Sequence, residues 1–423
     1  MEMQEKKGGN IAAIVTMFAL FFMIAFVTNF AGSMGVIVKN QFGASNTASQ
    51  LGSAANFFAY LFMGIPGGLI LRRKGYKFTA LTAVAVGFAG VGVQLLSGYV
   101  SSFAVYVTGA FVAGFSMCML NLVVNPLLNT LGGEGKKGNQ LVQIGCSLNS
   151  VGATLAPILL GILIGGEVAK AKVADAAPAL MIAMGLFALA FVIIALSKIP
   201  EPHMETAAEK EARLAGQTSV VKDIAETLKF RHFSFGALAI FFYIVIECGI
   251  PNMANLYMTQ AGQPGFTGAA VAGSVVGAYW FCMMVGRLVG GAIGGKVSSK
   301  VMITICSVGG IALMIAAMFA PVKMITVFGT QFPISMAFMA LCGLCTSVMW
   351  GGIFNLAAEG LGKYVPMGSG IFMACVFGGV CLPLQGMIAD KIGILNSYWM
   401  TIGLFAYVLF YALVLSKPAK RAE

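Results

Sequence analysis

The chain has 423 residues, of which 59% are hydrophobic and only 10% are charged. A water-soluble domain of this length has no interior large enough to hide so many apolar side chains, so the composition excludes an ordinary soluble protein. The formal net charge of +11 is typical of a membrane protein with basic cytoplasmic loops, and it requires no nucleic-acid partner.

Apolar stretches of roughly 20 residues, the length that crosses a bilayer as a helix, follow one another along the whole chain. Since lipid offers no hydrogen bonds to the backbone, we expect helices and not an open sheet. The first stretch is long and lacks an adjoining cleavage site, so we expect a retained helix and no signal peptide. The predicted spans are 11–38, 49–71, 78–97, 102–130, 140–165, 178–197, 233–259, 267–295, 300–320, 332–358, 366–388 and 394–416.

The 26 lysines and arginines are divided unequally between the two sides of this predicted topology. If the N-terminus is cytoplasmic, the outer side carries only Lys39, Lys170, Lys172, Lys323 and Lys391. Basic loops stay on the cytoplasmic side of a membrane. We therefore predict an even number of spans, with both termini in the cytoplasm.

One long polar segment separates six predicted spans from six more. We predict an N-terminal six-helix bundle over 1–197, a cytoplasmic linker over 198–232 and a C-terminal six-helix bundle over 233–423. Within the linker, the charged stretch 204–217 favours a short surface helix. The predicted fold class is an all-α membrane protein of twelve transmembrane helices in two halves, a layout typical of transporters that bind their substrate between the halves.

Several short motifs follow one another in order along both halves of the chain. They are NFFAYLFMGIPGG at 56–68 followed by RKGYK at 73–77, NPLLNTLG at 125–132, LVQ at 141–143 with NSVG at 149–152, AIFFY at 239–243 with Glu247, YW at 279–280 with MVGR at 284–287, and GLGKY at 360–364 with GSG at 368–370. Together they resemble the fucose/glucose/galactose permease family of the major facilitator superfamily. The resemblance implies the major facilitator fold and uptake of a sugar across a bacterial inner membrane, usually coupled to a proton or sodium ion. We expect a monomer in the lipid bilayer.

The chain departs from the family pattern at three positions. Arg72 stands where the superfamily has an acid in the loop after the second span. The first span has Ala31-Gly32-Ser33 where relatives similar to the fucose permease carry an Asp, and Asn121 replaces a Glu. The resemblance therefore puts proton coupling by the familiar route in question. A sugar uniporter and a carrier of a different solute remain alternatives, whereas the short linker argues against a sugar-sensing receptor.

Glu247 is the exception among the 15 acidic residues, because it falls deep inside a predicted span. Burying a carboxylate is costly, so we expect Glu247 to carry a coupling proton or to help hold a sodium ion. The alternative is a protonated Glu that hydrogen-bonds a neighbouring helix. Pro251 interrupts the helix four residues later and predicts free carbonyls over 249–252, with a simple kink as the alternative.

Neutral amides on the spans are the candidate contacts for sugar hydroxyl groups, since each amide offers donors and an acceptor. Asn121, Asn125 and Asn129 recur every four residues and so share one helix face. Gln143 matches a sugar-contacting Gln in the fucose-permease pattern. The alternative role of such amides is hydrogen bonding between helices. The candidate amides are Asn29, Asn56, Asn121, Asn125, Gln143, Asn149, Asn252, Asn255, Asn355 and Gln385.

Two further groups complete the candidate site. Aromatic rings pack on the flat faces of sugars, and the candidates are Tyr243, Trp280 and Trp350. Charged and glycine residues near the predicted cytoplasmic ends have an expected gating or structural role. These residues are Arg73, Lys74, Gly75, Arg287, Glu359 and Lys363. For Arg287, two positions remain open: its side chain reaches the cytoplasmic face, or it pairs with a carboxylate on another helix.

The sequence gives no sign of an enzyme, a metal site or a cofactor. Cys342 and Cys345 form a lone CxxC pair without a nearby His, so we interpret them as small buried residues. Both histidines, His203 and His232, fall in the linker, which excludes a histidine proton relay within the membrane. No Walker loop is present, so ATP is not expected to drive the protein.

Overall fold

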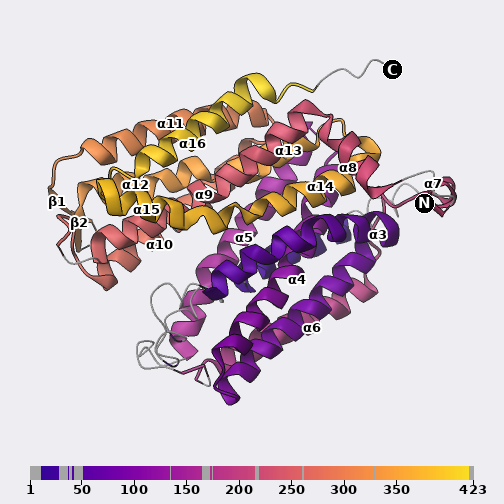
Figure 1. Ribbon diagram of the computed structural model, residues 1–423, viewed down its shortest axis with the longest axis horizontal. Coiled ribbons are helices and arrows are strands. Elements are labelled where there is room, and N and C mark those ends of the chain that lie inside the picture. The colour runs from indigo at the N-terminus through magenta and orange to yellow at the C-terminus, as the bar shows by residue number, and fades with distance from the viewer. Residues whose placement is uncertain are drawn as a thin grey trace. The chain divides into compact units, whose positions relative to one another are not determined.

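The computed structural model describes residues 11–27, 37, 41, 51–133, 135–163, 172–173, 175–214, 219–259, 262–327 and 329–418. Helices dominate these residues (Figure 1). Within them, nine helices are long and apolar enough to cross a membrane, and 11–27 forms a further, shorter apolar helix. One of the nine, α3 (Leu51–Tyr99), covers the described part of the predicted span 49–71 and all of the predicted span 78–97. The expected all-α membrane architecture is thus confirmed, whereas the number twelve stays a prediction.

The helix bounds follow the predicted spans closely in most places. The longer helices are α4 (Phe103–Leu131), α5 (Gly135–Leu163), α6 (Ala177–Leu196), α9 (Arg231–Thr259), α10 (Ala269–Ile293) and α11 (Ser299–Phe319). The shorter ones are α12 (Ile334–Thr346), α13 (Met349–Ala358), α14 (Val365–Ala374), α15 (Leu382–Ile392) and α16 (Tyr398–Phe410). The linker contains α7 (Ala207–Leu214), which matches the expected surface helix, and also α8 (Val220–Leu228).

Two predicted spans are interrupted within the described residues, and a third changes its helix type at its end. The span 332–358 divides into α12 and α13, and 366–388 divides into α14, a 3-10 segment (Cys375–Cys381) and α15. The last span ends in a π-helical turn, Tyr411–Leu415. Composition alone measures apolar length, so it does not reveal where the helical hydrogen-bond pattern changes. The predicted loop after α11 also forms a small antiparallel hairpin, β1 (Met324–Val327) with β2 (Thr330–Pro333), in which Met324 pairs with Pro333.

Mutual contacts divide the chain into two compact units. Unit 1 comprises 1–133, 151–229 and 360–377, and unit 2 comprises 134–150, 230–359 and 378–423. The linker helices therefore belong to unit 1. Two segments group with the opposite sequence half: the first part of α5 lies in unit 2, and α14 lies in unit 1.

In unit 1, α3 packs along α4, α6 and α14 (Figure 1). Gly75 interrupts α3 with φ 85°, a left-handed conformation that favours glycine, and so ends one apolar segment and begins the next. Gly64 and Gly68 let α3 approach the backbone of α14. A β-carbon built at Gly64 would lie 2.6 Å from the carbonyl oxygen of Gly370. Small residues at a crossing of this kind allow membrane helices to pack closely.

In unit 2, α9 to α13 and α16 pack against one another around a largely apolar interior. Tyr243, Tyr279, Tyr398 and Phe405 are among its fully buried side chains. The hydroxyl group of Tyr279 donates to the backbone carbonyl of Glu247 on α9, and that of Tyr398 donates to the backbone carbonyl of Ile250 on the same helix. The interior of unit 2 therefore combines apolar packing with a small number of polar contacts around the middle of α9.

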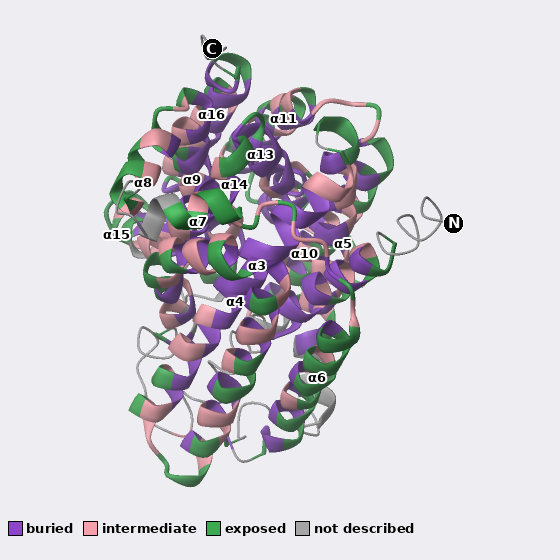
Figure 2. Ribbon diagram, turned by 90° about the vertical axis from the view of Figure 1, so that its right-hand side faces the viewer, coloured by how far each residue is buried: buried purple, intermediate pink, exposed green. Residues whose placement is uncertain are grey.

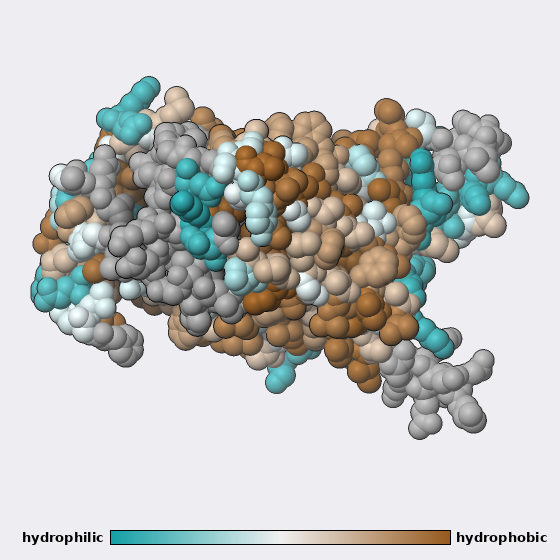
Figure 3. Space-filling model, turned by 90° about the horizontal axis from the view of Figure 1, so that it is seen from below, coloured by the Kyte–Doolittle hydropathy of each residue, from teal (hydrophilic) through white to brown (hydrophobic). Residues whose placement is uncertain are grey.

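Large apolar side chains also point outward. On α6, the exposed side chains include Met181, Leu189, Phe191 and Leu196, and exposed residues run along this helix in Figure 2. Figure 3 shows hydrophobic side chains over much of the described surface of the face it draws. A protein in water would not leave so many apolar side chains exposed, so these surfaces are suited to contact with lipid.

Candidate functional site

The most distinctive polar group of unit 2 is an ion pair within the predicted membrane-spanning helices. Nη2 of Arg287 on α10 donates to Oε1 of Glu247 on α9 at 2.9 Å. The two side chains are only 8% and 13% exposed. From the sequence, Arg287 could either reach the cytoplasmic surface or pair with a carboxylate. The structure shows that it pairs with Glu247.

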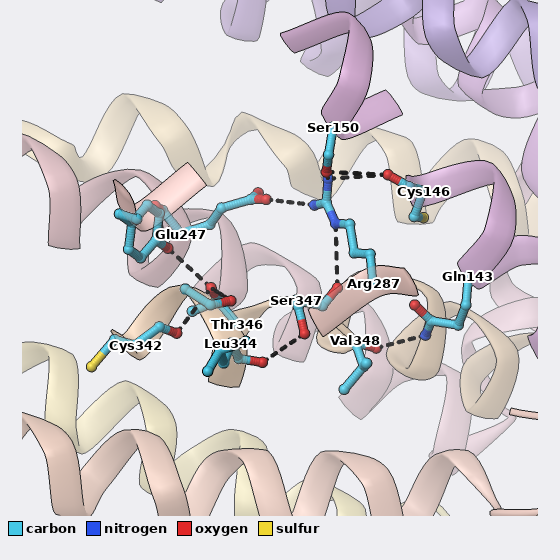
Figure 4. Close-up of polar contacts among 12 residues, drawn as sticks. Gln143, Cys146, Ser150, Glu247, Arg287, Cys342, Leu344, Thr346, Ser347 and Val348 are labelled. Atoms are coloured by element: carbon cyan, nitrogen blue, oxygen red, sulfur yellow. Dashed lines mark hydrogen bonds and ion pairs between the residues drawn. The ribbon is translucent and has the colours of Figure 1, made fainter. Parts of the chain in front are cut away.

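Arg287 also holds three partners besides Glu247 (Figure 4). Its Nη1 donates to Oγ of Ser150 at 2.7 Å and to the carbonyl oxygen of Cys146 at 3.4 Å, both on α5. Its Nε donates to the carbonyl oxygen of Ser347, between α12 and α13, at 3.3 Å. A guanidinium is charged at any physiological pH and carries five N–H donors, so it suits such a junction of helices. Ser150 and Ser347 are functional candidates that sequence reasoning missed, because a serine in a membrane helix gives no local signal of its partner.

Pro251 explains why a tyrosine lies beside the ion pair. Proline has no N–H, so the carbonyl oxygen of Glu247, four residues earlier, loses its partner within α9. Oη of Tyr279 donates to that oxygen at 3.0 Å and lies 3.0 Å from Oγ1 of Thr346. One turn away, Oη of Tyr398 donates to the carbonyl oxygen of Ile250 at 2.9 Å. Tyrosine hydroxyls thus satisfy the carbonyl oxygens of Glu247 and Ile250, of which the second lies in the 249–252 segment whose carbonyls the sequence had suggested would face a substrate or ion.

Gln143 lies fully buried on the part of α5 that belongs to unit 2. Its Nε2 donates to the carbonyl oxygen of Val348 at 2.9 Å, at the break between α12 and α13. Within the described part of the chain, its Oε1 is buried and has no hydrogen-bond partner. Because the bond to Val348 uses a donor, the side chain keeps an acceptor for a hydroxyl group.

Two more amides of unit 2 show the same pattern as Gln143. Asn355 donates to Oγ of Ser299 at 3.0 Å, and Gln385 donates to Oγ1 of Thr401 at 3.1 Å. In the described residues, their amide oxygens are buried and unpaired. Each of these oxygens can therefore accept a hydrogen bond from a hydroxyl group.

The remaining candidates of unit 2 lie in varied positions. Tyr243 is fully buried with its ring 6.3 Å from that of Trp350, and it is close enough to interact electrostatically with Glu247 and Arg287. Trp280 is half-buried against the ring of Tyr279. The other candidates are half-buried Asn149 and exposed Asn252 and Asn255.

Unit 1 contributes a separate group of amides. Asn121 is buried and donates to Oη of Tyr60 at 3.1 Å, while Nδ2 of Asn125 donates to the carbonyl oxygen of Asn121 at 3.0 Å. Asn56 is also buried, and its Nδ2 has no hydrogen-bond partner within the described residues. Asn29 lies outside the described residues.

The candidate gating residues lie near helix ends in both units. Arg73 and Lys74 are exposed beside the break at Gly75, and Lys363 and Glu359 are also exposed. The Lys363 ammonium lies over the ring of Tyr364, and the carbonyl oxygen of Glu359 pairs with Nε2 of His232. In this part of the described chain, Arg72 pairs with acidic side chains, Glu209 and Asp223, although the sequence had marked Arg72 only as a departure from the family pattern.

Membrane-length helices, close glycine crossings and a buried ion pair within the helices are features of a multi-pass membrane protein, and they are typical of transporters. The sequence profile of the Major Facilitator Superfamily matches residues 16–382. The chain belongs to that superfamily, as the resemblance had implied.

Relatives named as sugar transporters match nearly the whole chain. A glucose/galactose transporter of Brucella abortus is 28% identical over 408 residues, which cover 96% of this chain and 94% of the relative. The L-fucose-proton symporter of Escherichia coli is 21% identical over 440 residues, covering 98% of this chain and 96% of that protein. The crystal structure of the superfamily transporter FucP in its outward conformation has a TM-score of 0.78 at 20% identity and covers 96% of this chain and 98% of FucP. This structural likeness confirms the fold.

Proposed function

We propose that this chain imports a sugar, a monosaccharide or small oligosaccharide, across the inner (plasma) membrane by alternating access. The relatives named as glucose/galactose transporters and fucose-proton symporters support the substrate class. The neutral amides of both units suit an uncharged solute rich in hydroxyl groups, because they neither require nor repel a charge. The free acceptors of Gln143, Asn355 and Gln385 match hydroxyl donors.

The coupling ion is a proton in this proposal, and Glu247 carries it. The observation behind this choice is the guanidinium of Arg287, 2.9 Å from the carboxylate. A sodium ion at Glu247 would lie beside a permanent positive charge with little water to screen it, which is unfavourable. A proton instead neutralises the carboxylate and removes the attraction that holds Arg287.

Protonation of Glu247 would therefore change the contacts between helices. Arg287 binds Glu247 of α9, Ser150 of α5 and the carbonyl oxygen of Ser347. When the carboxylate is neutral, it no longer attracts the guanidinium as a counter-charge. The guanidinium then depends on its neutral acceptors, Ser150 and the carbonyl oxygens of Cys146 and Ser347. A proton bound at one residue thus alters the attachment of α5, as coupled transport requires.

Uptake into proteoliposomes tests this proposal. Purified wild-type protein is reconstituted and given radiolabelled glucose, galactose and fucose, with an imposed proton gradient, an imposed sodium gradient or neither. We expect accumulation with the proton gradient alone. Glu247→Gln should lose accumulation and keep sugar counterflow, whereas Glu211→Gln, at an exposed linker carboxylate, should resemble wild type.

Each other outcome contradicts a stated part of the proposal. Accumulation driven by sodium would reject the proton, and equilibration without accumulation under either gradient would indicate a uniporter. Absence of uptake for all sugars would reject the substrate class. A Gln143→Ala variant with unchanged half-saturation for sugar would remove that residue from the binding site.

A further inference from the structure

The linker supplies acidic partners to the loop that joins the two parts of α3. Arg72 is at the end of the first part, and its side chain is only 12% exposed. Its Nη1 donates to Oδ2 of Asp223 on α8, and its Nη2 lies 3.6 Å from Oε1 of Glu209 on α7. These carboxylates come from residues more than a hundred positions further along the chain, and the Asp223 pair is itself largely shielded from water, with side-chain exposures of 12% and 17%.

A third linker carboxylate holds the backbone of the same loop. Oε2 of Glu201 accepts from the amide of Tyr76, and Oε1 accepts from the amide of Lys77 at 2.9 Å. Gly75 makes room for this carboxylate, because a side chain at Gly75 would collide with it. In return, the backbone amide of Glu205 donates to the carbonyl oxygen of Arg72 at 2.8 Å. Side-chain and backbone contacts together fasten the linker to the loop.

We propose that residues 201–214 and 219–229, called the strap below, act as a conformational restraint on this loop. Asp223 and Glu209 both pair with Arg72, so a separate segment of the chain supplies the carboxylates that hold this loop.

The strap also reaches a segment from the second half of the sequence. Within unit 1, α8 packs against α14. Glu209 interacts electrostatically with Lys363, just before α14, as well as with Arg72. A hydrogen bond from the Thr206 amide, aided by the Thr206 hydroxyl and by these two cations, lowers the pKa of Glu209, so that the carboxylate stays charged near neutral pH. The strap therefore restrains the separation of α3 from α14.

Hydrogen exchange measured by mass spectrometry tests the restraint in the purified full-length protein. Asp223→Asn should speed exchange about tenfold in the peptides covering 72–80, 219–229 and 362–374, because it removes a shielded charged hydrogen bond. Glu226→Gln is the matched control, since Glu226 lies on the same helix but pairs with Lys229, whose side chain is 66% exposed. That control should leave all three peptides unchanged.

A charge reversal separates the specific pair from general damage to the linker. Arg72→Asp combined with Asp223→Arg should restore wild-type exchange in the three peptides, while each single reversal should not. Equal exchange in Asp223→Asn and wild type, or a double variant no better than the singles, would overturn the proposal. These readouts need no sugar and no gradient, so they are independent of the proposed transport. Only a further consequence rests on that function: Asp223→Asn should change the rate of sugar counterflow at unchanged sugar affinity.

Discussion

The guanidinium of Arg287 lies 2.9 Å from the carboxylate of Glu247, and both side chains are nearly shut off from water. If one of the two residues is removed, the charge of the other stays buried without a counter-charge. This costs far more free energy than the loss of a surface ion pair. The pair also links α9 to α5, because Arg287 donates to Ser150 as well. Stability and the proposed ion coupling therefore depend on the same contact.

Removal of Arg287 alone should destabilise the protein more than removal of both charges. We expect Arg287→Gln to lose about 3–5 kcal/mol of unfolding free energy, and Glu247→Gln combined with Arg287→Gln to recover much of it. Thermal unfolding can be followed with a thiol-reactive dye, since all nine cysteines are free and buried or half-buried. Lys229→Gln, which breaks an exposed pair, should change stability by less than about 1 kcal/mol. A double variant as unstable as Arg287→Gln would contradict the argument.

The hydroxyl of Tyr279 should contribute through the carbonyl oxygen that Pro251 leaves without a partner. Tyr279→Phe removes the 3.0 Å hydrogen bond to Glu247 and should cost about 1–3 kcal/mol, because the acceptor stays buried. Tyr99→Phe is the control, since Tyr99 is 70% exposed. The melting temperature of both variants decides the matter: equal values would show that water or another donor replaces the Tyr279 hydroxyl.

A methyl group at Gly64 should force α3 away from α14. The added carbon would lie 2.6 Å from both the Gly370 carbonyl oxygen and the Ala374 amide nitrogen, and backbone atoms cannot move aside as a flexible side chain can. We expect Gly64→Ala to lower the melting temperature and the rate of sugar counterflow. Gly277→Ala on α10 meets nothing within 4 Å and should be neutral or slightly stabilising, since alanine is the better helix former. Normal stability and counterflow in Gly64→Ala would show that the two helices are not in close contact in the membrane.

His203 on the strap should remain neutral at mildly acidic pH. Burial lowers the pKa of its ring from 6.5 to about 4, and its Nδ1 lies 2.6 Å from Oη of Tyr76. The unfolded chain takes up a proton near pH 6.5, so the stabilising contribution is complete above that pH and is lost as the pH falls toward 4.

The NMR spectrum of protein labelled at its two histidines measures this titration directly. Comparison with His203→Asn assigns the signal of His203. We expect no change in its ring shifts between pH 7.5 and 5.5, and a midpoint near 6.5 in denaturant. A midpoint near 6.5 in the folded protein would show that the ring is open to water and that the contact with Tyr76 does not shield it.

Much of the fold could be predicted because its signals are local. A helix that crosses lipid must be long, apolar and internally hydrogen-bonded, so α6, α9, α10 and α11 begin and end within a few residues of the predicted spans. The interruption of 366–388 could not be predicted in the same way. Its three segments are all apolar, and the difference between α-helical and 3-10 hydrogen bonding leaves little trace in composition.

Sequence alone determined that this is a membrane protein with one acid deep in a span, because burial of a charge is costly wherever its partner lies. The partner itself was decided by tertiary structure. Arg287 lies 40 positions from Glu247, and Asp223 lies 151 positions from Arg72. A buried charge requires a counter-charge within a few ångströms, but the sequence offers several residues that could supply it. Only the packing of helices brings one of them within reach.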